Sequence, residues 1–193
     1  MSEILNRVNV MIKNSIIFFL FLSLPVFAAE ETICTSNTNE KNIQASTPTS
    51  QFEFTQDGDI VTDKKTGLMW SRCPWNYHWE LSTCVGDAAT GKTSWQNSLT
   101  IANDNLTSDA PHLGFSDWRL PNIKEIASII EQKCAGFAIN RQVFGGAGSG
   151  VYWSNTHVDG GSNIRVVNFV SGQVTSAPST EEFFLRLVRD VTP

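Results

Sequence analysis

Eight consecutive residues of the chain match the pattern of a phosphate-binding loop. The segment Gly86-Asp87-Ala88-Ala89-Thr90-Gly91-Lys92-Thr93 fits Gly-x-x-x-x-Gly-Lys-Ser/Thr letter for letter. In such a loop the backbone amides hold nucleotide phosphates, the lysine reaches the outer phosphates and the last hydroxyl binds Mg²⁺. A functional loop also follows a buried apolar strand, whereas the mostly polar residues Glu80 to Cys84 precede this one. We therefore expect no nucleotide site and a surface position for Lys92.

Three aspartates near one turn are the type of oxygen ligand that calcium prefers. Asp57, Asp59 and Asp63 begin like an EF-hand loop, but Gly58 stands second instead of sixth. The twelfth position holds Leu68 in place of the glutamate that would supply two ligand oxygens. Aspartate is also a frequent turn residue, because its side chain caps nearby backbone amides. We expect turn residues and no metal site, with calcium as the alternative cofactor.

The remaining titratable residues form no catalytic pattern. The three histidines, His78, His112 and His157, lack the spacing of metal ligands, and no Gly-x-Ser-x-Gly or His-Glu-x-x-His motif occurs. Glu181 and Glu182 are adjacent, so on a strand they would point to opposite faces and could not share a substrate. The sequence therefore assigns no catalytic residue.

The N-terminus has the three parts of a secretory signal peptide. A basic segment with Arg7 and Lys13 precedes the apolar run Ile16 to Leu22, and small residues lead to a cleavage site after Ala28. The apolar run is too short to span a bilayer. We expect residues 1–28 to be removed, and the mature chain to be secreted or periplasmic without membrane insertion.

The charge balance bears on the kind of partner. The whole chain has a net charge of −5 at pH 7. An acidic protein is poorly suited to nucleic acid or to an anionic membrane surface, because both repel it at long range. We expect neither as a partner.

All four cysteines lie after the cleavage site. In an oxidising compartment an even number of cysteines predicts two disulfides, for which three pairings exist. We favour Cys73–Cys84, which closes a short aromatic loop, and Cys34–Cys134, which ties an N-terminal arm to the body. A zinc site is not expected, because no Cys-x-x-Cys spacing occurs.

The loop between Cys73 and Cys84 contains the candidate binding residues. They are Trp75, Tyr77, His78 and Trp79, and in an extended segment Trp75, Tyr77 and Trp79 share one face. These rings could stack on sugars or anchor a protein partner. They could equally fold inward as a small core under the loop, since large apolar residues are usually buried. We give the two interpretations equal weight.

The rest of the chain alternates between short strands and two helices. Residues 29–51 are polar and predict a flexible arm, and a single domain follows over 52–193. One helix should begin at Trp95 behind Ser94, and the second at Asn122, with Glu125 as its capping-box partner and an apolar face that continues to Cys134. Strands are expected at 52–55, 60–62, 68–70, 151–154, 164–170 and 183–188. This order predicts an α+β fold with short antiparallel strands, not a parallel doubly wound sheet.

The ordered motifs resemble those of the Lcl C-terminal domain family, named from the tail domain of the Legionella collagen-like adhesin. The motifs lie at 57–63, 66–70, 114–121, 152–154 and 188–189, with Trp95 opening the first helix. The resemblance implies a C-type-lectin-like fold, stabilised here by disulfides, and binding of carbohydrate or a host surface. Its motif residues should lock the core, with each arginine paired to aspartate or to backbone carbonyls. They are Trp70, Trp118, Arg119, Trp153 and Arg189.

These observations favour an exported, non-catalytic, adhesin-like binding module, with a glycan or a surface protein as partner. This chain lacks the collagen repeats of the named member, and its acidity suits a sulfated polyanion badly. Two alternatives are open. One is an oxidase related to formylglycine-generating enzymes, which requires a reactive thiol pair. The other is a structural component of the envelope.

Overall fold

The computed structural model describes residues 33–34, 43–87, 89–107, 112–145, 150–158, 160 and 162–191. The expected signal peptide, most of the arm before residue 43, the centre of the glycine-rich segment 145–150 and the side chain of His112 lie outside the described residues. All elements below belong to the unit Glu31–Pro193.

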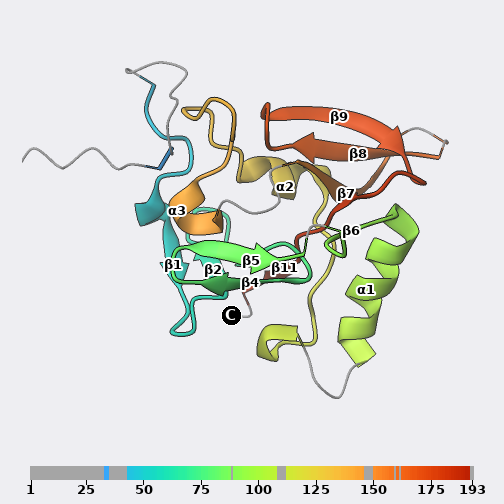
Figure 1. The fold of residues 1–193 in the computed structure, drawn as a ribbon, viewed down its shortest axis with the longest axis horizontal. Coiled ribbons are helices and arrows are strands. Elements are labelled where there is room, and N and C mark those ends of the chain that lie inside the picture. The colour runs from blue at the N-terminus through green and yellow to red at the C-terminus, as the bar shows by residue number, and fades with distance from the viewer. Residues whose placement is uncertain are drawn as a thin grey trace, which may run out of the picture. The chain divides into compact units, whose positions relative to one another are not determined.

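Two main sheets and one hairpin make up the β structure (Figure 1). The first sheet is antiparallel, in the order β1 (Phe52–Phe54), β2 (Ile60–Asp63), β3 (Leu68–Ser71) and β11 (Val188–Asp190). The second has the order β6 (Lys92–Thr93), β10 (Phe183–Phe184), β7 (Val151–His157), β8 (Asn163–Asn168) and β9 (Gln173–Pro178). Its strands are antiparallel except β10 and β7, which pair in parallel. The hairpin consists of β4 (Tyr77–Glu80) and β5 (Thr83–Gly86).

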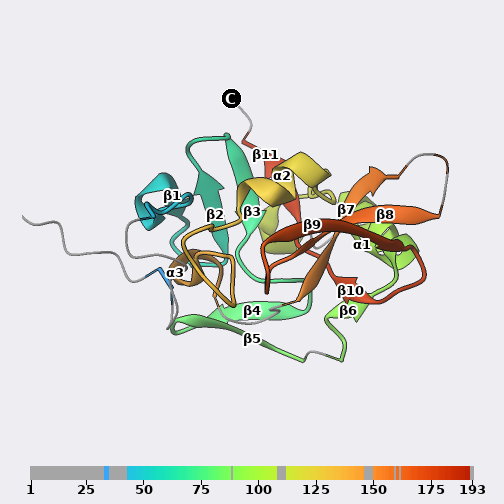
Figure 2. The same cartoon turned by 90° about the horizontal axis from the view of Figure 1, so that it is seen from above.

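The helices are short apart from one. They are α1 (Trp95–Thr107), α2 (Ile123–Ser128) and α3 (Arg141–Phe144), with the 3₁₀ turns η1 (Thr49–Gln51) and η2 (His112–Gly114). Both α1 and α2 contact β7, and α2 also contacts β8. Figure 2 shows the hairpin along one side of this unit, and α2 with the end of β11 on the opposite side. The α+β class with mainly antiparallel strands is thus confirmed.

The second helix begins where its sequence predicts and ends early. Asn122 Oδ1 accepts the backbone N–H groups of Lys124 and Glu125, and Glu125 Oε2 accepts the N–H of Asn122 at 2.7 Å, which completes the capping box. The apolar spacing predicted a helix to Cys134, but α2 stops at Ser128. Ile130 instead forms an antiparallel bridge with Ile139. The prediction of the helix end was wrong because a tertiary contact replaced the local periodicity.

The segment expected as one strand at 183–188 is two strands in different sheets. Phe183–Phe184 forms β10 of the second sheet, and Val188–Asp190 forms β11 of the first. Residues 185–187 cross between the sheets and are fully buried. The Leu187 N–H donates to the Ser71 hydroxyl, and its carbonyl accepts the Ser71 N–H. An apolar run buried on both sides resembles a strand in sequence even where it is a crossover.

The described part of the N-terminal arm is anchored, although its polar composition predicted flexibility. Glu131 is fully buried, and its carboxylate accepts the N–H groups of Ser46, Thr47 and Lys133 at 3.0, 2.7 and 2.8 Å. The Thr47 hydroxyl donates to the same carboxylate at 2.9 Å. Farther toward the N-terminus, Cys34 is disulfide-bonded to Cys134. The polar side chains of Ser46 and Thr47 thus bind the body of the domain.

Candidate binding site

A disulfide closes the hairpin onto the end of the first sheet. Cys73 pairs with Cys84, and the structure also pairs Cys34 with Cys134, so both favoured pairs are present. Cys84 stands opposite Trp79 in the hairpin register. The segment expected as an aromatic loop is therefore a two-stranded ribbon. Its turn residue Leu81 has a left-handed backbone (φ 55°) and is 95% exposed.

The two glycines of the phosphate-loop pattern support a tyrosine ring. A methyl group on Gly91 would lie 2.5 Å from Cε2 of Tyr77, and one on Gly86 would lie 2.7 Å from its Cγ. The ring also meets Phe184 edge-on, with centroids 6.2 Å apart. Lys92 is exposed and lies 5.1 Å above the Phe184 ring centroid. The glycines are thus needed for close packing, and the strand before them, β5, is mostly exposed, unlike the strand before a nucleotide loop.

The other two aromatic rings also turn inward. The Arg72 guanidinium lies 3.1 Å from the Trp79 ring centroid, so it covers one face of the indole. Trp75 packs against the second hydrophobic cluster, beneath the crossover segment. All three rings are half-buried, while His78 between them is exposed. This arrangement corresponds to the small core under the hairpin more than to an open stacking platform.

Arg72 holds the hairpin to the body. Its guanidinium donates to the carbonyl oxygens of Gly58, Gln142 and Val143 at 3.1, 2.7 and 2.5 Å. Burial lowers the pKa of Arg72 to about 10, and the nearby Asp59 carboxylate opposes this decrease. Arg72 therefore stays charged at neutral pH, with its N–H groups directed at protein carbonyls.

A small pocket lies between the hairpin and the first sheet. Its volume is about 110 Å³, and it is lined by Asp59, Ser71, Cys73, Tyr77, His78 and Leu113. Asp59 Oδ1 accepts the backbone N–H of Trp79 at 3.0 Å, which fixes the carboxylate at the pocket wall. The His78 imidazole lies 3.7 Å from the Glu80 carboxylate. The pocket thus draws its lining from three separate segments of the chain, and the lining includes the acidic residue Asp59 and the exposed residue His78.

The three aspartates considered for calcium do not converge. Asp63 is fully buried and accepts from Gln51 Nε2, the Lys65 N–H and the Thr66 hydroxyl at 2.8, 2.9 and 2.8 Å. It therefore caps the turn after β2, whereas Asp59 faces the pocket. Among the residues that the structure describes, no group of three or more metal-binding side chains could hold an ion.

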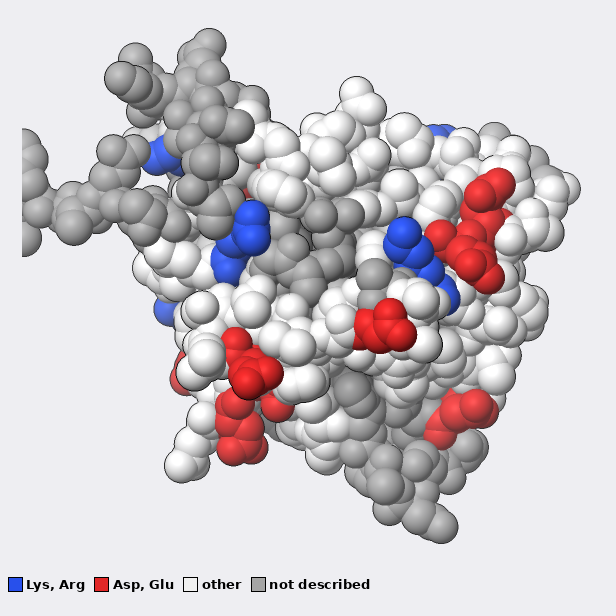
Figure 3. All heavy atoms as spheres, viewed as in Figure 1, with Lys and Arg blue, Asp and Glu red and all other residues white. Residues whose placement is uncertain are grey.

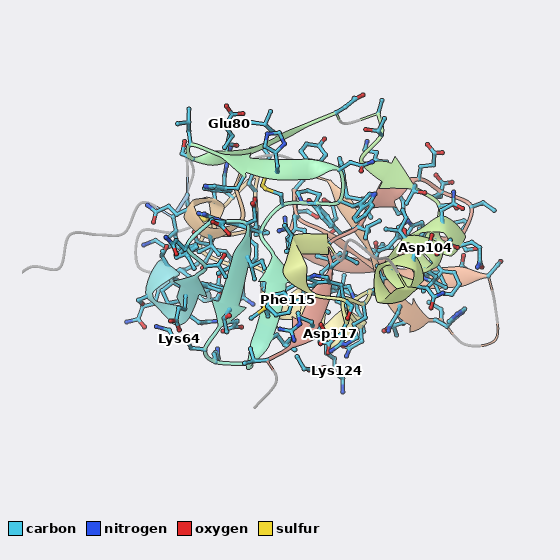
Figure 4. All side chains as sticks on the ribbon, turned by 90° about the horizontal axis from the view of Figure 1, so that it is seen from below. Lys64, Glu80, Asp104, Phe115, Asp117 and Lys124 are labelled. Atoms are coloured by element: carbon cyan, nitrogen blue, oxygen red, sulfur yellow. A yellow bond between two sulfur atoms is a disulfide. The ribbon has the colours of Figure 1, made fainter. Side chains whose placement is uncertain are left out.

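The motif residues that carry the family resemblance lie in the core and at its edge. Trp70, Trp118 and Trp153 are completely buried. Arg189 pairs with Asp117 through Nε–Oδ1 and Nη2–Oδ2 distances of 2.6 and 3.0 Å. The Arg189 hydrogen bond lowers the pKa of the Asp117 carboxyl. Figure 4 shows Asp117 and Phe115 near each other, and the Arg189 guanidinium lies 4.0 Å from the Phe115 ring centroid.

Arg119 secures the same edge from the other side. Its guanidinium binds Glu125 at 2.8 and 2.9 Å and Asp190 at 3.2 Å, and the Glu125 hydrogen bond raises the pKa of Arg119. The backbone of Arg119 also bridges Val188 of β11. The motif Gly114–Pro121 is thus a segment that is bonded to β11 beside the first sheet.

The buried residue Arg186 was not predicted from the sequence. Arg186 lies in the crossover, with its guanidinium 4.9 and 5.6 Å from the ring centroids of Phe144 and Tyr152. Its Nη1 donates to the carbonyl oxygens of Ser71 and Arg72, and burial lowers the pKa of Arg186. A single arginine inside the apolar run Phe183 to Val188 was the available signal. Arg186 fixes the backbone that leads into the pocket.

The charged side chains on the visible face are dispersed. Figure 3 shows acidic groups in several separate places and basic groups in a few. Neither sign forms a continuous stripe among the residues drawn there, so this face has no feature typical of polyanion binding.

Comparison with known proteins gives one match. The family model described as the Lcl C-terminal domain matches residues 59–189, from the pocket aspartate to the buried Arg189. No curated protein matches the chain. In the part of the chain that the structure describes, no helix has the length and apolar character needed to cross a membrane.

Proposed function

Because the chain belongs to the Lcl C-terminal domain family, we propose that it is an exported, adhesin-like binding module that acts without catalysis. Its body is C-type-lectin-like in this proposal, and the hairpin pocket is the binding site. The two disulfides support export, because such bonds persist in oxidising compartments. Trp75, Tyr77 and Trp79 then support the hairpin, while His78 faces the ligand.

The size of the pocket is the observation that carries the proposal. Its volume of about 110 Å³ is well below the roughly 300–1,000 Å³ of sites that enclose a small molecule. It can take a single group of a larger ligand, such as one sugar substituent or one side chain. This suits attachment to a surface better than turnover of an enclosed substrate.

The oxidase alternative requires a reactive thiol pair, and all four cysteines are in disulfides. Cys73 and Cys84 are each only 5% exposed, which disfavours thiol exchange. Thiol labelling of the protein at neutral pH tests this alternative. Complete protection is expected, and labelled cysteines would favour the oxidase.

A glycan array and an array of surface proteins, each probed with and without calcium, test the proposed function. We expect His78→Ala to weaken binding at least about tenfold, because His78 lines the pocket. His157→Ala is the matched control, since His157 is also exposed but lies in β7 of the second sheet. Equal binding of the two variants would contradict the proposed site. Stable oligomers without ligand binding would favour a structural envelope role.

A further inference from the structure

We infer that the pocket receives the side chain of a lysine presented by a protein partner. This inference rests on the proposed binding function of the same pocket and names the group that enters it. It follows from the charge of the pocket wall, from its shape and from the charge of the whole chain.

The pocket wall offers hydrogen-bond acceptors for a cation. Asp59 is a lining residue, and its Oδ1 atom receives one N–H, from Trp79. The lining residue His78 is exposed and lies beside the carboxylate of Glu80. An ammonium group bound to a carboxylate forms a charge-assisted hydrogen bond, which is stronger than a hydrogen bond between neutral groups.

The neighbouring cation is directed elsewhere. Arg72 stands between the lining residues Ser71 and Cys73, but it does not line the pocket itself. Successive side chains on an extended chain point to opposite faces. Its guanidinium accordingly meets the carbonyl oxygens of Gly58, Gln142 and Val143 and the Trp79 ring. It partly offsets the charge of Asp59 but does not occupy the pocket.

The shape of the pocket favours a linear group. Leu113 supplies apolar surface, and a lysine places an aliphatic stem behind its charged end. A pocket of about 110 Å³ suits this narrow chain better than a whole hexosamine ring. The net charge of −5 attracts a basic protein surface at longer range.

NMR titration of the ¹⁵N-labelled protein with Nα-acetyl-lysine N-methylamide tests the inference. Saturable shifts are expected at the amides of Asp59, His78 and Leu113. Asp59→Asn should weaken binding about tenfold or more, because the charge is lost. The asparagine oxygen can still accept the Trp79 N–H, so the fold is kept. Asp57→Asn is the matched control, since Asp57 is exposed and does not line the pocket.

Four results would overturn the inference. The first is equal binding of the uncharged norleucine analogue, and the second is an Asp59→Asn variant that binds lysine normally. Tighter binding of glucosamine would assign the pocket to an amino sugar instead. Absence of any saturable shift with the lysine probe also rejects the inference, but leaves the proposed function to be decided by the array assay with His78→Ala.

Discussion

Replacement of Glu131 by glutamine should release the N-terminal arm and lower the stability of the whole domain. The glutamine oxygen can keep the Ser46 and Lys133 N–H bonds that Oε1 accepts now. The amide nitrogen then stands where Oε2 accepts the Thr47 N–H at 2.7 Å, so one donor faces another. Thr47 is 1% exposed, and water therefore cannot replace the lost acceptor without opening the arm.

The size of this effect follows from the individual bonds. An unsatisfied buried donor costs about 1–3 kcal/mol, and the bonds that remain lose the strength of a charged acceptor, about 1 kcal/mol each. We expect the free energy of unfolding to fall by about 3–5 kcal/mol for Glu131→Gln.

Urea unfolding monitored by fluorescence measures the loss, and hydrogen exchange at the Ser46 and Thr47 amides locates it. Glu181→Gln makes the same chemical change at an exposed position and should stay within about 0.5 kcal/mol of the wild type. A Glu131→Gln midpoint equal to that of the Glu181 control would refute the view that this carboxylate anchors the arm.

Three further changes test the hairpin and the sheet edge. Gly91→Ala should lower the free energy of unfolding, measured in urea, by about 1–3 kcal/mol, because the added methyl group meets the Tyr77 ring. In a Tyr77→Ala background this loss should disappear, whereas additive losses from the two substitutions would reject the contact. Trp79→Ala should lower unfolding free energy by about 3 kcal/mol, whereas an unchanged midpoint would indicate an exposed platform. Because Arg189 holds the folded pKa of Asp117 below its ordinary value, their pair stabilises the fold above about pH 4 and loses this contribution as the pH falls through the folded pKa. Asp117→Asn should therefore lower the urea midpoint at pH 7 by an amount that decreases as the pH is lowered below about 4, and a loss that does not depend on pH would contradict this assignment.

Local sequence patterns were enough to predict the structure where the contacting residues lie close together in the chain. The capping box of Asn122 and Glu125 is complete within four positions, and the helix starts as predicted. The turn role of Asp63 is equally local, since two of its bonds go to Lys65 and Thr66. Such interactions depend on spacing alone, so a single sequence reveals them.

Contacts between distant segments could not be predicted in this way. Glu131 looks like a surface glutamate until residues 46 and 47 are placed beside it, and Arg186 looks like a break in a strand until two backbone carbonyls face it. The pocket shares this property, because Asp59, His78 and Leu113 are brought together only by the fold. The motif residues indicated the family and the cysteines indicated the two disulfides, but no pattern indicated the pocket.

The bond between Cys34 and Cys134 determines how the protein would carry mechanical load. A pull applied before Cys34 and at the C-terminus travels through the sulfur atoms to Cys134, so the covalent path bypasses every residue in between. The segment between the two cysteines, which are 100 residues apart in the sequence, cannot be extended by this pull, because the disulfide joins its two ends. The hairpin, its own disulfide and five of the six pocket residues from Asp59 to His78 lie in that enclosed stretch, as does Leu113. The covalent path therefore leaves the pocket residues out of the line of tension, whereas Arg186, which fixes the backbone beside the pocket, lies in the segment that bears it.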